Sequence, residues 1–221
     1  MESMTRPTLT IASKNYGSWS LRGWLLCKFA GLDFDEIQQD PSDPATRAEL
    51  LLLAPSFRVP SLYIDGVVIG DTLAIAEELN ERFPAAGLLP SDPRARAHCR
   101  TISGEMHSGF ANLRSALPMN LRARYERFPV WSAARTDIAR ICEIWQSCLR
   151  SSRGPYLFGD TPTIADAMYA PVCTRFVTYG VDVSEVLSKY CQTMLGHPAM
   201  REWIDAAEAE PTSIVELDAE F

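Results

Sequence analysis

Residues 15–20 (Asn-Tyr-Gly-Ser-Trp-Ser) contain groups that could activate a sulfur ligand, because they lie between a β-rich run and an apolar helical pattern. A helix N-terminus presents unpaired N–H groups and a partial positive charge, which favour a bound anion. A hydroxyl there can donate a hydrogen bond to a ligand thiolate and lower the pKa of the thiol; a shift of about two units is worth roughly 2.7 kcal/mol. Ser18 is the candidate catalytic residue and Ser20 the alternative hydroxyl, whereas a plain helix cap is the simpler role for either serine.

The second candidate is the stretch Arg58-Val59-Pro60, directly ahead of a predicted strand. Proline suits a strand start because it cannot donate to the ladder. A cis Val59–Pro60 bond would turn the Val59 backbone outward, where it could pair with a peptide-like ligand as an added strand does. An ordinary trans proline that opens the strand is the alternative.

The third candidate is Gly70-Asp71-Thr72, at the start of a predicted helix. Asp and Thr are common N-cap residues, so capping is the simpler interpretation. As ligand-binding groups, the Thr72 hydroxyl and N–H would receive a carboxylate while Asp71 pairs with an ammonium group. This arrangement would suit an amino acid with both groups free at one end.

Strand and helix patterns alternate over the first part of the chain in the order βαβαββα. Predicted strands cover residues 8–12, 34–38, 60–64 and 67–69, and predicted helices cover 18–30, 45–54 and 72–82. The pair Asp65-Gly66 is a strong hairpin signal between the last two strands. In such a domain the three candidate loops share one edge of the sheet.

Residues 85–94 contain glycine, proline and polar residues typical of a linker. Beyond them only helical patterns appear, at 95–116, 133–150, 163–178, 184–195 and 198–209. The predicted fold class is therefore α/β plus all-α, with an α/β domain over residues 1–88 and an all-helical domain over residues 89–221.

Composition excludes several classes of function. The 221 residues include 47% hydrophobic and 22% charged residues, an ordinary globular balance. The net charge of −7 argues against binding to nucleic acid or an anionic membrane. No apolar run approaches the roughly 20 residues of a spanning helix, and the first residues lack the apolar core of a signal peptide. The six cysteines show no metal-ligand spacing, so we expect a cytoplasmic protein with reduced thiols and no metal.

Three longer runs closely resemble the glutathione S-transferase superfamily: SWSLRGWLLCKFAGL, RVPSLYIDGVVIGDTLAIAEELNERFP and GDTPTIADAMYAP. Within it, the chain looks most like bacterial relatives of the zeta class, which includes maleylacetoacetate isomerases. The resemblance covers nearly the whole chain. It implies a thioredoxin-like N-terminal domain that binds glutathione as co-substrate, a helical-bundle C-terminal domain with an electrophile pocket, and a homodimer that acts in detoxification.

The resemblance also assigns roles within the three loops. It implies that Ser18 activates the glutathione thiol, that Pro60 is a cis-proline, and that Val59 holds the cysteinyl backbone of glutathione. The implied glutathione-binding set is Ser18, Arg58, Val59, Pro60, Asp71 and Thr72. A further motif, Thr163 to Asp166, matches a structural capping box in the C-terminal core helix.

The helix predicted over 102–116 is expected to line the electrophile pocket together with the first loop. The candidate pocket residues are Tyr16, Trp19, Met106, His107, Phe110, Arg114 and Arg175. For Met106 and Phe110 the favoured alternative is core or dimer packing, and for His107 it is a solvated or hydrogen-bonded side chain.

Three functions compete at this stage. The leading hypothesis is attack of the glutathione thiolate on a small electrophile, by substitution, addition or peroxide reduction. Zeta members usually carry a hydroxyl and a cysteine where this chain has Gly17 and Trp19, a departure that favours the transferase over the isomerase. The alternative, isomerisation of a maleyl-type diacid, needs cationic groups, for which Arg114 and Arg175 are the candidates. The third hypothesis is a non-catalytic binding protein that has kept the fold.

Overall fold

The computed structural model describes residues 6–40, 43–50, 59–126, 128–211 and 213–218. Its sheet has four strands in the order β2-β1-β3-β4. β1 pairs in parallel with β2 and antiparallel with β3, and β3 and β4 form an antiparallel hairpin. The strands are β1 (Thr8–Ile11), β2 (Asp35–Gln38), β3 (Ser61–Ile64) and β4 (Val67–Gly70).

The N-terminal domain interleaves these strands with α1 (Ser18–Phe29), α2 (Pro44–Leu50) and α3 (Thr72–Arg82), so the predicted βαβαββα order is confirmed. This arrangement is a thioredoxin-like domain. The part of the second predicted helix beyond residue 50 lies outside the described residues.

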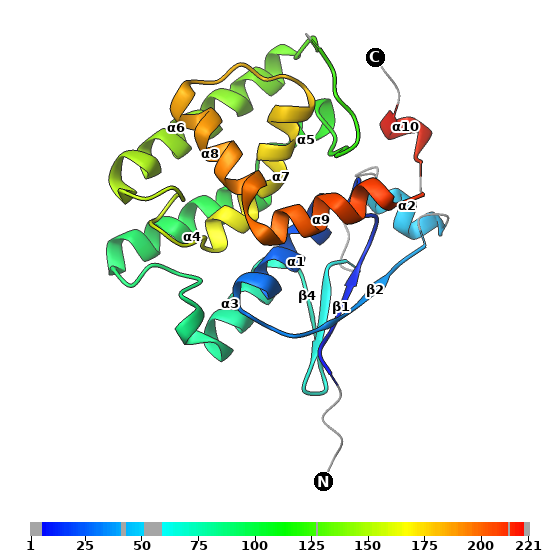
Figure 1. The fold of residues 1–221 in the computed structure, drawn as a ribbon, viewed down its shortest axis with the longest axis vertical. Helices are drawn as coiled ribbons and strands as arrows, with labels where there is room; N and C mark the ends of the chain where they lie inside the picture. The colour runs from blue at the N-terminus through cyan, green and yellow to red at the C-terminus, as the bar shows by residue number, and fades with distance from the viewer. Residues whose placement is uncertain (1–5, 41–42, 51–58, 127, 212, 219–221) are drawn as a thin grey trace.

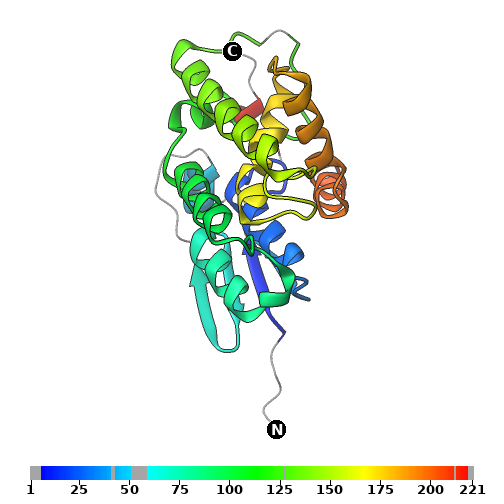
Figure 2. The same cartoon turned by 90° about the vertical axis from the view of Figure 1, so that its left-hand side faces the viewer.

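Helices alone build the C-terminal domain within the described part of the chain, and Figure 2 shows it at one end of the sheet domain. Its core element is α7 (Ile164–Thr178), which contacts α1, α4 and α8 and is buried along nearly its whole length. The remaining elements are η1 (Pro84–Ala86), α4 (Pro93–Ser108), α5 (Ala111–Ala116), α6 (Ser132–Ser152), α8 (Glu185–Gly196), α9 (Pro198–Ala209) and α10 (Val215–Asp218).

The two domains share one hydrophobic core, because α1 packs on α3 on one side and on α7 and α9 on the other (Figure 1). Trp24 of α1 meets Trp203 of α9 edge-on, with ring centroids 5.3 Å apart. Both indoles are fully buried, so they contribute a large part of the apolar contact between the domains. The residues at the start of α1 are thereby held at the junction of the two domains.

The predicted capping box at the start of α7 is confirmed. Asp166 is completely buried, and its Oδ2 accepts the Thr163 N–H at 2.8 Å. Its Oδ1 accepts the Leu157 N–H at 3.1 Å and the Tyr190 hydroxyl at 3.0 Å. One carboxylate therefore fixes the start of α7, the loop before it and α8.

Two elements differ from the sequence prediction. The single helix predicted over 95–116 is two helices, α4 and α5, because the chain turns at Phe110, whose φ is +58°. The short helix α10 follows α9, in a tail for which the sequence offers no interpretation. Both differences affect the site, since the turn reorients Arg114 and the tail contacts the first loop.

Candidate active site

Ser18 is the first residue of α1 and is buried, with a relative exposure of 6%. Its N–H donates to the Tyr16 carbonyl at 2.9 Å, and the described residues supply no hydrogen-bond partner for its hydroxyl. The N-cap position is Gly17, without a side-chain cap, so capping does not account for Ser18. A Cβ on Gly17 would lie 2.4 Å from the Ser13 carbonyl oxygen, so only glycine fits this turn.

Ser20 has a structural role instead. Its hydroxyl accepts the Ala12 N–H at 2.9 Å and is buried in the turn between β1 and α1. Of the two serines considered from the sequence, Ser18 is therefore the one with a free hydroxyl at the helix N-terminus, where a bound anion is stabilised.

The Val59–Pro60 peptide bond is cis, as predicted, and it directly precedes β3. Pro60 packs on α1 at Gly23, where a Cβ would lie 2.6 Å from the proline ring. This close approach explains why glycine occupies the middle of α1, and it brings the proline loop against the helix that carries Ser18. Arg58 lies outside the described residues.

Asp71 caps α3, its Oδ1 accepting the N–H groups of Leu73 at 2.8 Å and Ala74 at 3.3 Å. Its second oxygen lies 3.1 Å from Nε2 of His107 on α4. Thr72 Oγ1 lies 3.3 Å from Nδ1 of the same ring. The two side chains predicted to hold an amino-acid end are thus joined by a histidine from the other domain.

Burial lowers the pKa of His107, with the positive charges of Arg22 and Arg114 acting in the same direction and Asp71 opposing them. The ring is therefore neutral near pH 7. A neutral ring with its proton on Nε2 donates to Asp71 and accepts the Thr72 hydroxyl proton at Nδ1, which satisfies both contacts.

Two guanidinium groups pack against the ring of Trp19. The guanidinium carbon of Arg22 lies 4.2 Å from the ring centroid and that of Arg114 lies 5.3 Å from it. His107 meets the indole edge-on, with centroids 5.1 Å apart. Side chains from α1, α4 and α5 therefore converge beside Ser18.

Arg22 is completely buried, and only its Nε has a partner among the described residues, the Met168 carbonyl at 2.9 Å. Its two terminal nitrogens are buried and unpaired there, as is Nε of Arg114. Arg175 is 2% exposed and donates to the carbonyls of Leu117 and Pro171.

Burial lowers the pKa of all three arginines, that of Arg175 to about 10, and their mutual repulsion adds to the shift for Arg22 and Arg175. Within the described part of the chain none of them forms an ion pair with a carboxylate, although Asp137 attracts Arg114. Buried guanidinium groups without a counter-ion are costly, so this cluster is a candidate binding site for an anion.

Three of the predicted pocket residues lie elsewhere. Met106 and Phe110 belong to the main hydrophobic core, so core packing, the alternative favoured from the sequence, accounts for both. The Tyr16 hydroxyl is buried against the C-terminal segment, where it donates to Asp218 Oδ1 at 2.6 Å. Tyr16 is predicted to reach the pocket, whereas its hydroxyl instead contacts the C-terminal segment.

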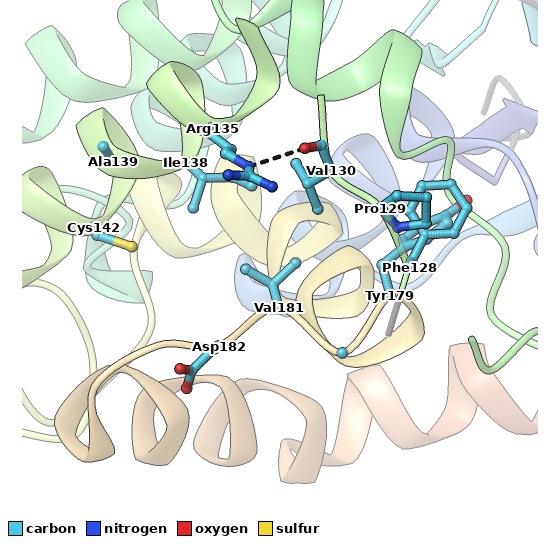
Figure 3. Close-up of a pocket in the computed structure, with 11 residues that line it drawn as sticks. Phe128, Pro129, Val130, Arg135, Ile138, Ala139, Cys142, Tyr179, Val181 and Asp182 are labelled. Atoms are coloured by element: carbon cyan, nitrogen blue, oxygen red, sulfur yellow. Dashed lines mark hydrogen bonds between the residues drawn. The ribbon is translucent and has the colours of Figure 1, made fainter. Parts of the chain in front are cut away.

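A cavity of about 630 Å³ lies in the C-terminal domain, between α6 and the residues that follow α7 (Figure 3). Arg135 closes one side by donating to the Val130 carbonyl at 2.9 Å. Of the predicted site residues that the structure describes, none lines this cavity. It is therefore separate from the candidate site.

Two further findings bear on the class of protein. The described residues contain no group of three or more histidine, cysteine, aspartate or glutamate side chains arranged to hold a metal ion. Among the same residues, no helix has the length and apolar character needed to cross a bilayer.

Comparison with known proteins gives the family. The pattern of the glutathione S-transferase N-terminal domain matches residues 16–82, and that of the C-terminal domain matches residues 108–206. Maleylacetoacetate isomerase of Rattus norvegicus is 32% identical over 183 residues, which span 81% of this chain and 82% of the relative. The chain belongs to the glutathione S-transferase family.

Other members of the family support this assignment. A probable maleylacetoacetate isomerase of Caenorhabditis elegans is 29% identical, over 89% of this chain and 92% of its own length. Among solved structures, maleylacetoacetate isomerase of Anaeromyxobacter dehalogenans superposes with a TM-score of 0.68 at 25% identity, covering 97% of this chain and 96% of the relative. That transferase-family structure has dicarboxyethyl glutathione and citrate bound in its active site. The homodimer and the cytoplasmic location expected from the resemblance stay predictions.

Sequence reasoning missed Arg22 as a site residue. It is the one arginine within an otherwise apolar stretch of α1, three positions after Trp19, and this spacing places both side chains on one face of the helix. A charge on a helix face that is otherwise buried is the signal that could have identified it.

Proposed function

We propose that this protein is a glutathione-dependent cis–trans isomerase that acts on a small maleyl-type dicarboxylate. The observation that supports this proposal is the cluster of Arg22, Arg114 and Arg175. Arg22 and Arg175 are buried and Arg114 is half-buried, and none of the three forms an ion pair with a carboxylate among the described residues. Asp71 and Thr72 are the groups matched to the γ-glutamyl end of glutathione, and a dicarboxylate substrate would supply anions for the arginines. The similarity to maleylacetoacetate isomerases points to the same substrate class.

Glutathione would bind along the N-terminal domain. The Val59 backbone would pair with its cysteinyl unit as an added strand does, and Asp71 and Thr72 would receive its ammonium and carboxylate groups. Arg58 would add a cationic contact. The thiol would then lie at the N-terminus of α1, where the free hydroxyl of Ser18 donates to the thiolate and lowers its pKa.

The reaction follows from the chemistry of a thiolate beside bound carboxylates. The thiolate forms a C–S bond to one carbon of the cis double bond, and the π electrons move to the conjugated carbonyl as an enolate. The former double bond is now single and rotates. The enolate then re-forms the double bond in the trans geometry and expels the thiolate, so that glutathione returns unchanged and no redox partner is consumed. The arginines would stabilise the carboxylates and the enolate.

The second candidate is a transferase, in which the thiolate stays attached to the electrophile. Gly17 and Trp19 favour it, since they stand where zeta members carry a hydroxyl and a cysteine. The arginine cluster fits this reaction too, provided that the electrophile is anionic.

The deciding experiment incubates the purified protein with maleylacetone, with and without glutathione, and follows the cis and trans isomers by chromatography. We expect glutathione-dependent isomerisation that falls strongly in Ser18→Ala and Arg114→Met and is unchanged in Arg201→Met, since Arg201 is exposed on α9. A stable glutathione adduct without isomerisation would establish the transferase instead. Failure to bind glutathione at all would refute both.

A further inference from the structure

The C-terminal segment, Ser213–Asp218, folds back from the end of α9 onto the N-terminal domain. In Figure 1 its helix α10 lies beyond the end of α9, near α2. The segment is absent from the pattern that matches the C-terminal domain, which ends at residue 206. Its contacts fall on the β1–α1 loop, on Val59 and on α2, and also on Asn120 in the loop that follows α5.

The polar part of this contact centres on the Tyr16 hydroxyl. It donates to Asp218 Oδ1 at 2.6 Å and accepts the Ile214 N–H at 3.3 Å and a guanidinium N–H of Arg122 at 3.2 Å. Asn120 donates to the same Asp218 oxygen at 2.8 Å. A single hydroxyl, two residues before Ser18, therefore ties the C-terminal segment to the loop that carries the candidate catalytic group.

The apolar part is a small cluster separate from the main core. Ile214 is 1% exposed and packs with Ala12, Tyr16 and Val59, each of which is also buried. Val59 belongs to the loop whose backbone is expected to pair with glutathione. The C-terminal segment thus covers the side chain of the residue whose backbone would receive the ligand.

Both ends of the segment are anchored to the N-terminal domain. Before it, Glu210 Oε2 accepts the Asn15 N–H at 2.9 Å and the Ser13 hydroxyl at 3.1 Å, and Oε1 accepts from Gln38 of β2. Near its end, Glu216 pairs with Arg47 of α2, an exposed ion pair that holds the segment weakly. The segment therefore lies across the glutathione-binding edge of the sheet from β2 to Val59.

We propose that Ser213–Asp218 is a strap that positions Val59 and the Ser18 loop for glutathione, with Ile214 and Tyr16 as its positioning residues. The inference rests on the proposed function, because it assigns the strap to the glutathione site of that reaction. A small apolar cluster and a few polar contacts hold the strap, so we expect it to open locally more readily than the main core. When glutathione pairs with the Val59 backbone, it holds in place the residue against which Ile214 packs. Ligand binding and closure of the strap therefore stabilise each other.

The test measures glutathione binding by calorimetry in the full chain and in three variants: Ile214→Ala, Tyr16→Phe and a chain that ends at Glu210. The truncated chain keeps the Glu210 anchor and the whole of α9. We expect the Kd for glutathione to rise about tenfold in each variant, whereas kcat at saturating glutathione stays within about twofold of wild type. Val186→Ala, which removes an exposed aliphatic group from α8, is the matched control and leaves Kd unchanged.

Hydrogen–deuterium exchange supplies a second test, because exchange in a tail with a purely structural role would not respond to glutathione. Glutathione should slow exchange of the Ile214 and Asp218 amides in the wild type, and this protection should disappear in Tyr16→Phe. Normal glutathione affinity in Ile214→Ala and in the truncated chain would overturn the strap while leaving the proposed function intact. A wild-type protein that does not bind glutathione would overturn both.

Discussion

Replacement of Arg22 by methionine is expected to change stability and catalysis in opposite directions. The side chain is fully buried, and its terminal nitrogens have no partner among the described residues. The folded protein therefore carries the free-energy cost of removing the Arg22 charge from water, with no ion pair from the described residues to offset it. Arg22→Met removes that charge and keeps most of the apolar volume beside Trp19.

The expected change in stability is favourable. Replacing a buried ion by a hydrophobic group of similar size raises the free energy of unfolding by between zero and about 3 kcal/mol. The lost bond from Arg22 Nε leaves the Met168 carbonyl inside α7, where the helical pattern supplies another donor, so its cost is small. Catalysis changes in the opposite direction. Loss of one charge-assisted interaction with a substrate carboxylate costs about 2 to 3 kcal/mol, or roughly 30- to 160-fold in kcat/KM.

The assay combines urea unfolding, followed by tryptophan fluorescence, with initial rates on maleylacetone at saturating glutathione. Arg22→Lys, which keeps the charge but loses the planar fork, should recover part of the activity without the gain in stability. A loss of more than about 2 kcal/mol in Arg22→Met would refute the reasoning, because it would mean that the native structure neutralises the charge. Unchanged kcat/KM would equally exclude Arg22 from the anion site.

The remaining predictions concern the thiol, a histidine and the core. Ser18→Ala should raise the pKa of the bound glutathione thiol by about two units and lower kcat about 100-fold, with little change in the Kd for glutathione. Thiolate absorbance followed against pH would measure the pKa, and a binding titration would measure the Kd. Because the pKa of His107 is lowered in the fold, the unfolded chain binds more protons below about pH 6.5, so stability should fall as the pH drops from 7 to 5. His107→Gln should reduce that dependence in urea titrations at each pH, leaving the part due to His197, whose pKa burial also lowers; an unaltered slope would contradict the prediction. Asp166→Ala leaves the Thr163 and Leu157 N–H groups and the Tyr190 hydroxyl unpaired, so thermal or urea unfolding should show a loss of at least about 3 kcal/mol.

The sequence alone predicts the parts of this protein that depend on local patterns. Alternating strand and helix periods give the βαβαββα order, and α3 begins and ends at the predicted residues. The capping box at Thr163 and Asp166 is confirmed as well. In each case the signal lies within a few residues, where hydrogen-bond geometry and hydrophobic periodicity act directly on the chain. The cis bond before Pro60 is also present, but the residues themselves left cis and trans open and only the family resemblance implied it.

The tertiary structure decided which side chains meet. Only the packing of α1 against α7, and of the Trp19 side chain against side chains of α4 and α5, shows that Arg22 joins Arg114 and Arg175. Only the tertiary structure shows that His107 joins Asp71 to Thr72. The tertiary structure also engages the Ser20 hydroxyl in a turn, and it places the Tyr16 hydroxyl against the C-terminal segment. These contacts join residues up to about 200 positions apart, and their energies depend on burial and on the charges of neighbours from other elements. A pattern along the chain contains neither burial nor the charges of distant neighbours, which is why the candidate loops could be found from the sequence and the arginine cluster could not.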